Sequence, residues 1–340
     1  MIEPLKFDIT MRATTLVTVT YADRIEYLSE LLRRAFECEG VNQAVVVSNA
    51  STSDLRIIEN EWGDRLRVVR LSSNSGSANG YSVGIQAALA DNAEFIWLMD
   101  DDNAPRKGAL RKLHSQLEIT ARAYGADRSA VLGFRPSHQA DIAQGVDPER
   151  AYPLRSSFFG FHYRQLIFKI KRRIGPKAPL GEAPSSVQIP YAPYGGLMAS
   201  RKLFEAIGLP NVDFVLYADD TEYTRRITAR GGTICLATDA ELEDLEESWN
   251  LKESYPNTFL GWLKGGSDFR AFYAARNQAY FDSKIWTSSW IEYRMNRCIY
   301  LGLLTFFAIK TQSFARYRLL LRAIRDGKNS RLGISKSFPL

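Results

Sequence analysis

The sequence predicts an α/β protein with a mostly parallel sheet flanked by helices, followed by a helical, basic C-terminal region. Short apolar runs rich in β-branched residues alternate with amphipathic helical patterns through the first half of the chain, which is typical of βαβ units. One such run ends on three consecutive aspartates, at the end of a strand, where open α/β sheets bind ligands. The 340 residues, 45% of them hydrophobic, are enough to bury a substantial core.

The individual elements follow from this pattern in chain order. Each predicted strand is short and apolar, and turn residues separate it from the next helical period. The strands of the first half are predicted at 15–20, 44–48, 68–71 and 95–99, and the helices between them at 25–36, 54–62 and 81–90. A glycine turn, a strand and a helix are expected over 194–207, and a further helix within 215–230.

The pattern is interrupted once and later changes character. Residues from about 156 to 190 join an aromatic, basic stretch to the Pro- and Gly-rich segment GPKAPLGEAPSS, which indicates an insertion or a flexible loop. Near residue 240 an acidic run precedes a predominantly helical, basic region. We therefore expect a sheet-containing domain over 1–240 and a mainly helical region over 241–340.

Positive charge is concentrated at the end of the chain. The 44 Lys and Arg residues exceed the 38 Asp and Glu residues, and residues 291–340 alone hold ten basic and two acidic residues, a net charge of +8. The segment RQLIFKIKRR at 164–173 and the C-terminal arginines fit helices that lie on an anionic membrane surface. A homodimer interface, or a helix packed on its own core, is the alternative. No nucleic-acid-binding module is present in the sequence.

The cysteines, the first residues and the apolar runs indicate the cellular compartment of the protein. Cys38, Cys235 and Cys298 have no paired spacing, so neither a zinc centre nor a disulfide framework is expected. The first residues lack the basic-then-apolar layout of a secretory signal. The longest mostly apolar run, Cys298–Ile309, has 12 residues, whereas a helix needs roughly 20 to cross a bilayer. These features favour a cytoplasmic location.

The strongest chemical signal is the triplet Asp100, Asp101 and Asp102 after the strand 95–99. Adjacent carboxylates repel one another, and a hard cation such as Mg²⁺ or Mn²⁺ would relieve this while bridging the phosphates of a substrate. Alternation along the strand predicts Asp100 and Asp102 on one side and Asp101 on the other. The competing interpretation is a solvated turn that caps the following helix.

A second acidic group, Asp219, Asp220 and Glu222, lies in LYADDTEY. A carboxylate there could serve as a general base if burial raises its pKa, whereas acids in a first helical turn also favour the helix dipole. A weaker signal is a glycine loop before a helix, which either cradles a nucleotide or only makes a turn. Its residues are Asn74, Gly76 and Gly80.

The order of these signals resembles the family 2 glycosyltransferases of the GT-A fold, and among them the galactofuranosyl- and rhamnosyltransferases that build bacterial envelope polysaccharides. The resemblance covers about residues 14–280 and rests on an ordered set of motifs. These are VTVTY at 17–21, SNAS at 48–51, NSGSANGYSVGI at 74–85, LMDDDN at 98–103, YGGLMASRKLFEAIGLP at 194–210, LYADDTEY at 216–223 and YAARN at 273–277.

The resemblance implies a role for each matched residue. Asp100 and Asp102 would hold Mn²⁺ or Mg²⁺ on the diphosphate of a UDP- or dTDP-linked sugar, where the ion stabilises the leaving nucleoside diphosphate. Asp220 would deprotonate the acceptor hydroxyl, with inversion at the anomeric carbon, and Asp219 and Glu222 would orient acceptor and base. The implied donor contacts are Thr20, Ser48, Asn49, Asn74, Gly80, Asp100, Asp101, Gly195 and Gly196. The YAARN residues Tyr273, Arg276 and Asn277 would help to close the site or pack their helix.

The sequence departs from its relatives at two places. Many of them carry Asp where Ser48 stands, which leaves the nucleotide open. They also often supply a histidine metal ligand after the base motif. Asp244, or alternatively Glu243, falls at that place here, and a carboxylate oxygen suits Mg²⁺ or Mn²⁺, although a solvated acidic face is the alternative. The three histidines of the chain all precede the base motif: His114, His138 and His162.

The sequence thus predicts a metal-dependent, inverting glycosyltransferase that adds galactofuranose or rhamnose to a polyprenyl-linked or growing envelope glycan. It would be a peripheral protein on the inner face of the cell membrane. A sugar-phosphate nucleotidyltransferase is the alternative enzyme, but YADR at 21–24 stands where such enzymes have a basic, glycine-rich pyrophosphate loop. A catalytically inactive, glycan-binding scaffold is the alternative outside enzymes, because the usual histidine is missing.

Overall fold

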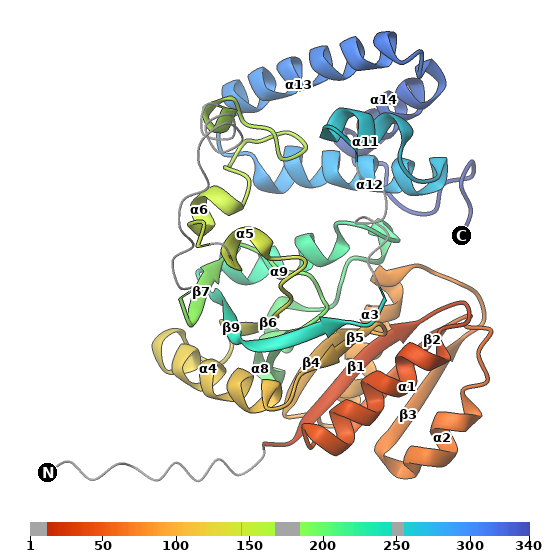
Figure 1. The fold of residues 1–340 in the computed structure, drawn as a ribbon, viewed down its shortest axis with the longest axis vertical. Coiled ribbons are helices and arrows are strands. Elements are labelled where there is room, and N and C mark those ends of the chain that lie inside the picture. Colours follow the sequence, from red (N-terminus) through yellow and green to blue (C-terminus); the bar gives the residue numbers. More distant parts are fainter. Residues whose placement is uncertain (1–11, 144, 167–183, 247–254) are drawn as a thin grey trace, which may run out of the picture.

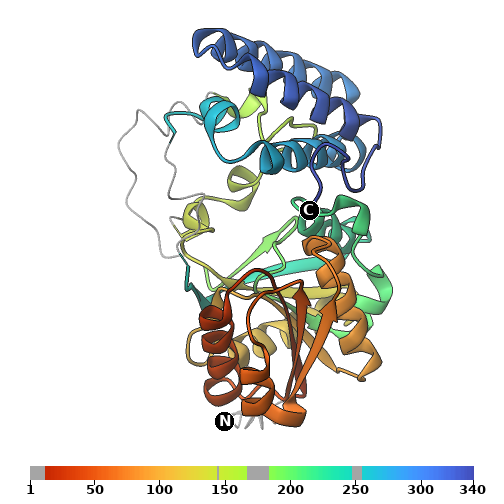
Figure 2. The ribbon, with the colours of Figure 1, turned by 90° about the vertical axis from the view of Figure 1, so that its right-hand side faces the viewer.

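A mixed nine-stranded sheet forms the first part of the protein, and a block of helices is stacked on one side of it (Figures 1 and 2). The computed structural model describes residues 12–143, 145–166, 184–246 and 255–340. The strand order is β3-β2-β1-β4-β8-β6-β9-β5, and β7 also pairs with β9. The four N-terminal strands run parallel to one another, as expected. They are β1 (Thr14–Thr20), β2 (Gln43–Asn49), β3 (Leu66–Leu71) and β4 (Phe95–Asp100).

The second half of the sheet is mixed, whereas the sequence predicted a mostly parallel sheet. β8 (Leu197–Ser200) lies antiparallel between β4 and β6 (Ser129–Phe134). β9 (Thr233–Asp244) runs parallel to β6. Two short strands, β5 (Asn103–Pro105) and β7 (Ser186–Ile189), pair antiparallel with β9. The mixed pairing brings the end of β9 next to the end of β4, which places the two acidic segments together.

Helices cover both faces of the sheet because the strands are apolar on both sides. Along β2, Ala44 and Val46 pack in one hydrophobic cluster and Val45 and Val47 in the other, as the two-residue period of a strand requires. One face is covered by α1 (Ile25–Arg33), α2 (Arg56–Trp62) and α4 (Ala109–Tyr124). The other face is covered by α3 (Ser77–Ala90), α8 (Arg201–Ile207) and α9 (Asp219–Ala229).

Short elements join these layers. α1 is followed by one π-helical turn, so the helix predicted to Phe36 ends in a different geometry, and α3 begins four residues before its predicted start. The connecting helices are η1 (Arg34–Cys38), η2 (Gly63–Arg65), α5 (Ala140–Ala143), α6 (Pro148–Ala151), η3 (Val212–Phe214) and η4 (Asp282–Trp286).

The C-terminal helices have a core of their own. Tyr300, Leu304 and Leu320 are buried in it together with Phe158, which comes from the predicted insertion. The first residues of that insertion are therefore part of the helical core and not a loose loop, while residues 167–183 lie outside the described chain. The helices are α11 (Thr258–Lys264), α12 (Asp268–Phe281), α13 (Trp290–Lys310) and α14 (Phe314–Lys328).

Candidate active site

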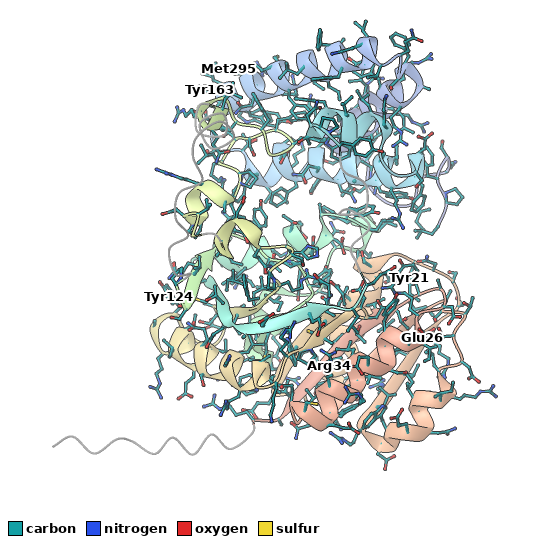
Figure 3. All side chains as sticks on the ribbon, in the orientation of Figure 1. Tyr21, Glu26, Arg34, Tyr124, Tyr163 and Met295 are labelled. Atoms are coloured by element: carbon teal, nitrogen blue, oxygen red, sulfur yellow. The ribbon has the colours of Figure 1, made fainter. Side chains whose placement is uncertain are left out.

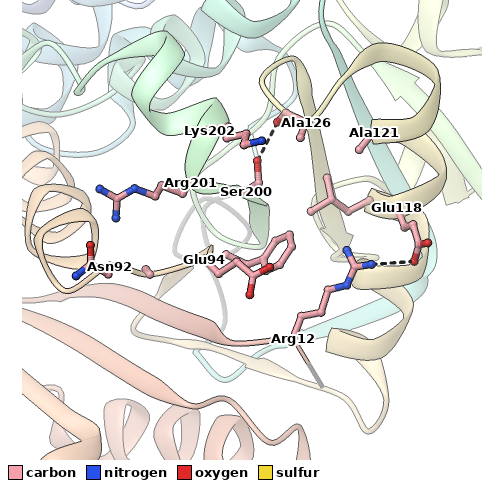
Figure 4. Close-up of a pocket in the computed structure, with 12 residues that line it drawn as sticks. Arg12, Asn92, Glu94, Glu118, Ala121, Ala126, Ser200, Arg201 and Lys202 are labelled. Carbon is pink, nitrogen blue, oxygen red and sulfur yellow. Dashed lines mark hydrogen bonds and ion pairs between the residues drawn. The ribbon is translucent and has the colours of Figure 1, made fainter. Parts of the chain in front are cut away.

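Two pockets lie at different ends of the strands. The first, of about 450 Å³, lies where β4 begins and β8 ends, between Arg12, Phe95 and Ser200 (Figure 4). The second, of about 580 Å³, is lined by residues of the segment from Arg135 to Thr221, among them Asp220. Because α/β sheets bind ligands at the carboxyl ends of their parallel strands, the second pocket and the acidic groups beside it form the candidate site.

The three aspartates of the acidic triplet have two different sets of partners. Asp100 ends β4, and its Oδ1 accepts a 2.8 Å hydrogen bond from the hydroxyl of Tyr81. Asp101 and Asp102 both bind the guanidinium of Arg24, at 2.9 Å from Nε and 2.8 Å from Nη2. The prediction that strand alternation separates Asp101 from Asp102 is wrong, because the strand ends at Asp100 and a turn brings the next two carboxylates to one cation.

Asp244 joins this acidic group from the far strand. The pairing of β5 with β9 sets Asn103 opposite Asp244, and the Asn103 amide donates to Oδ1 of Asp244 (3.0 Å) and of Asp102 (3.2 Å). Nη1 of Arg135 lies 3.4 Å from Asp100 Oδ2 and 3.5 Å from Asp244 Oδ1. Glu243 instead pairs with Arg34 at 2.7 Å. Of the two carboxylates considered from the sequence, Asp244 is the one that reaches the cluster.

The donor atoms around this cluster suit a hard cation. Asp100, Asp102 and Asp244 contribute only oxygen, which Mg²⁺ and Mn²⁺ prefer, and the guanidinium of Arg135 now stands between Asp100 and Asp244 as a positive charge. Among the described residues, no three His, Cys, Asp or Glu side chains are arranged to enclose an ion. An ion bound by these carboxylates would therefore have to replace contacts that the guanidinium makes.

A histidine reaches the same cluster from an unexpected part of the chain. His138 follows β6, and its Nε2 lies 3.6 Å from Asp244 Oδ2. Sequence analysis did not assign Arg135 or His138 to the site. The signal that could have found them is their position directly after the apolar run 130–134, since polar residues at the end of a buried strand face the ligand edge of the sheet.

The glycine turn expected against the sugar packs against the acidic cluster. A Cβ on Gly195 would lie 2.3 Å from Asp100 Oδ2 and 2.5 Å from Asn103 Oδ1, so only glycine fits there. Gly196 has a φ of +100° and donates a backbone hydrogen bond to Leu98. The two glycines let the backbone approach the carboxylates at the end of β4.

Asp219 and Asp220 begin α9 at the edge of the second pocket. Asp219 is buried and accepts a 3.0 Å hydrogen bond from Ser77. Asp220 is half-buried and lines the pocket, and Thr221 donates to it from both its backbone and its hydroxyl group. Burial raises the pKa of both carboxyls above their ordinary range. Asp220 thus has the exposure to the pocket and the raised pKa that a general base needs.

Glu222 is not brought to this pocket. Its carboxylate forms two hydrogen bonds, of 2.8 and 2.6 Å, with Arg226 one turn later in α9. Arg226 also donates to the backbone oxygens of Ile207 and Leu209. These contacts join α9 to the end of α8, a stabilising role that differs from the expected orientation of acceptor and base.

The loop that delivers the aspartate pair has unusual backbone geometry. Val215, Tyr217 and Ala218 all have positive φ angles, of 69°, 67° and 58°. The backbone N–H of Leu216 donates to Phe214 across Val215, which makes a rare, strained γ-turn. Non-glycine residues adopt such conformations only where surrounding contacts hold them, and they gather at functional sites.

Residues of the YAARN motif supply these contacts. The buried amide of Asn277 donates to the backbone oxygens of Phe214 (2.7 Å), Leu216 (2.8 Å) and Tyr217 (3.0 Å). Arg276 also donates to Phe214, at 3.1 Å. Arg276 and Asn277 therefore hold the loop before α9 from the helical block. Tyr273 instead donates its hydroxyl to the backbone oxygen of Phe338.

The glycine loop at 74–80 touches the same strained segment. The Asn49 amide donates to Asn74 at 2.9 Å, which fixes the loop to the end of β2. A Cβ on Gly76 would lie 2.1 Å from the backbone oxygen of Val215, so the two loops are in direct contact. Gly80 allows α3 to approach β1, because a Cβ there would lie 2.6 Å from Val19.

The remaining expected donor contacts lie at the carboxyl ends of neighbouring strands. Thr20 and Ser48 are paired across β1 and β2, and both are buried. The second pocket is also lined by two tyrosines that the sequence analysis did not single out. Tyr152 and Tyr191 pack edge to face, with ring centroids 5.2 Å apart, in the same lining as Asp220.

The mixed sheet flanked by helices has the GT-A fold. The crystal structure of GalNAc-T7 with UDP, GalNAc and Mn²⁺ matches the chain with a TM-score of 0.51, at 13% identity, over 84% of this chain and 50% of that chain. The likeness concerns the fold alone. Residues 15–181 match the model of glycosyl transferase family 2. The family match therefore applies to this domain, which makes up just under half of the chain.

Two curated relatives match the chain at low sequence identity. The chain is 26% identical to the galactofuranosyltransferase GlfT1 of Mycobacterium tuberculosis over 190 residues, which is 55% of each chain. It is 24% identical to the low-salt glycan biosynthesis hexosyltransferase Agl10 of Haloferax volcanii over 272 residues, 75% of this chain and 77% of that one. The matched stretch thus spans about half the length of the mycobacterial relative.

Proposed function

We propose that the protein is an inverting glycosyltransferase that moves a hexosyl group from a nucleotide diphosphate donor to a hydroxyl group of a glycan acceptor. The observation that carries the proposal is the carboxylate of Asp220, which lies in a pocket and has a raised pKa, next to the acidic edge formed by β4 and β9. Such a carboxylate can take the proton of an acceptor hydroxyl as its oxygen attacks the anomeric carbon.

The acidic edge is the proposed place of the donor diphosphate. Asp100, Asp102 and Asp244 would hold Mn²⁺ or Mg²⁺, which when bound stabilises negative charge on the leaving nucleoside diphosphate. Thr20, Ser48, Asn49 and Asn74 would contact the nucleoside, and the turn at 195–196 would accommodate the sugar. Arg24 and Arg135, the two cations bound to these carboxylates, are available to rebind phosphate oxygens when an ion takes their place.

The finer assignments are part of the same proposal. The donor sugar is galactofuranose or rhamnose on UDP or dTDP, supported by the galactofuranosyltransferase among the relatives. The acceptor is a polyprenyl-linked or growing envelope glycan, and the protein acts in the cytoplasm on the inner face of the membrane. We also propose a division into a sheet domain over 1–240 and a helical region over 241–340, although β9 itself continues to Asp244.

Donor turnover tests the function directly. A panel of UDP- and dTDP-sugars, including UDP-galactofuranose and dTDP-rhamnose, is incubated with the protein, a lipid-linked acceptor and Mn²⁺ or Mg²⁺. We expect one donor to release nucleoside diphosphate, and the chelator EDTA to stop the release. Release that EDTA does not affect would contradict the proposed requirement for Mn²⁺ or Mg²⁺. If no donor of the panel releases nucleoside diphosphate, the inactive, glycan-binding scaffold would be favoured.

The metal ligands can be tested without turnover. Asp244→Asn is expected to weaken Mn²⁺ binding by about tenfold or more, because it removes a charged oxygen ligand. Glu243→Gln is the matched control, since the neighbouring carboxylate binds Arg34 and should leave Mn²⁺ affinity unchanged. The electron paramagnetic resonance signal of free Mn²⁺ measures both affinities. Equal effects of the two substitutions would contradict the assignment of Asp244.

A further inference from the structure

The outer face of α13 is apolar and uncovered. Six large apolar side chains on it are between 38% and 75% exposed, and they recur every three or four residues, which aligns them along one side of the helix. We call them the α13 outer face; they are Ile291, Met295, Ile299, Leu303, Phe306 and Ile309. At about 1.5 Å per residue, the stripe is about 27 Å long.

Packing within the chain explains only the opposite side of α13. There Tyr293, Tyr300 and Leu304 are buried in the core of the helical block. In Figure 1, α13 lies at the top of the helical block, on the side away from the sheet. A contiguous exposed apolar stripe of this kind marks an interaction surface.

Basic side chains lie near both ends of α13. Burial lowers the pKa of Lys328, and the charges of Arg297, Arg294 and Lys284 lower it further, so four cations gather near one end of the stripe. Lys310 is at the other end. None of these five forms an ion pair with a carboxylate in the described part of the chain. Between Cys298 and Ile309 the helix carries no charge.

This combination points to the kind of partner. A second copy of the chain docked through the same face would bring its own cations against these, and like charges at close range oppose association. An anionic lipid surface would neutralise the cations while the apolar side chains enter the acyl boundary, as in helices that lie in the interface plane. Among the described helices, none has both the length and the apolarity to span a bilayer.

We propose that the α13 outer face is the surface by which this protein docks on an anionic membrane, with α13 lying in the plane of the interface. The proposal deepens the membrane location proposed above but rests on other residues. Arg164, at the start of the basic segment noted in the sequence, pairs with Glu292, and Tyr163 donates its backbone N–H to Asn296. Tyr163 and Met295 lie at the same end of the molecule (Figure 3).

Flotation of the full chain with lipid vesicles tests the proposal. We expect binding to vesicles of phosphatidylcholine with phosphatidylglycerol, weakened by salt, and much less binding to phosphatidylcholine alone. The double substitution Leu303→Ser with Phe306→Ser should weaken binding by about tenfold or more. Ile57→Ser with Ile119→Ser is the matched control, because both residues are exposed apolar side chains on helices of the sheet domain.

Other outcomes would overturn the proposal. The first is that the Leu303→Ser, Phe306→Ser variant binds vesicles as well as the wild type does. The second is that this variant and the control variant lose vesicle binding to the same extent. A lipid-free wild-type dimer in sedimentation equilibrium that this variant converts to a monomer, without vesicle binding, would assign the face to a subunit interface instead. An unchanged melting temperature of the variant shows that it folds. Vesicle binding requires no turnover, so its failure is separate from failure of the proposed transfer activity.

Discussion

Asp220→Asn is expected to lower kcat by about 10²- to 10⁴-fold while nucleotide binding stays close to that of the wild type. Asparagine keeps the size and the hydrogen bond from Thr221 but cannot accept the proton of an acceptor hydroxyl. Single-turnover transfer with the donor identified by the panel measures the chemical step, and calorimetry with the nucleoside diphosphate measures binding. Asp239→Asn, the same change at an exposed position of β9, is the control.

The pH profile gives an independent readout of the same residue. Because burial raises the pKa of Asp220 and Asp219, the base is protonated and inactive over a range in which an ordinary carboxyl is already ionised. The acid limb of kcat should therefore lie above the usual carboxyl range, and activity should rise with pH through it. The residual activity of Asp220→Asn should lose that limb. Turnover that survives with the wild-type profile would show that another group is the base.

Asn277→Asp is expected to destabilise the protein by about 2–4 kcal/mol and to lower kcat by about 10²-fold. The substitution replaces an amide that donates to three backbone oxygens by a carboxylate that only accepts, so all three oxygens lose this donor and face a negative charge. The strained turn at Val215 then loses the contacts with Asn277, and Asp219 and Asp220 begin α9 four residues after it.

Thermal unfolding and single-turnover kinetics separate the two parts of this prediction. Asn329→Asp, the same chemical change at an exposed position after α14, should leave both quantities near wild type. If Asn277→Asp lowers the melting temperature but leaves kcat unchanged well below it, the amide stabilises the fold without positioning the aspartate pair. Full stability and full activity would contradict both roles.

Local sequence patterns determined the N-terminal half of the fold. The strands at 15–20, 44–48, 68–71 and 95–99 each appear within two residues of their predicted bounds, because short apolar runs between turn residues form strands wherever helices cover both faces. The second half was harder to predict, since the antiparallel insertion of β8 between β4 and β6 is a matter of long-range pairing that no local period encodes.

The sequence by itself also indicated the acidic groups of the site and the order in which they occur. Asp100, Asp102 and Asp220 could be singled out because the local sequence alone shows carboxylates that follow an apolar strand or precede a helix. Only the tertiary structure decided their partners. Arg135 and His138 reach Asp244 because β6 and β9 are neighbours in the sheet, and Asn277 holds the loop at 214–217 across about 60 residues of chain. Such contacts depend on how strands and helices pack, and packing is a property of the whole chain.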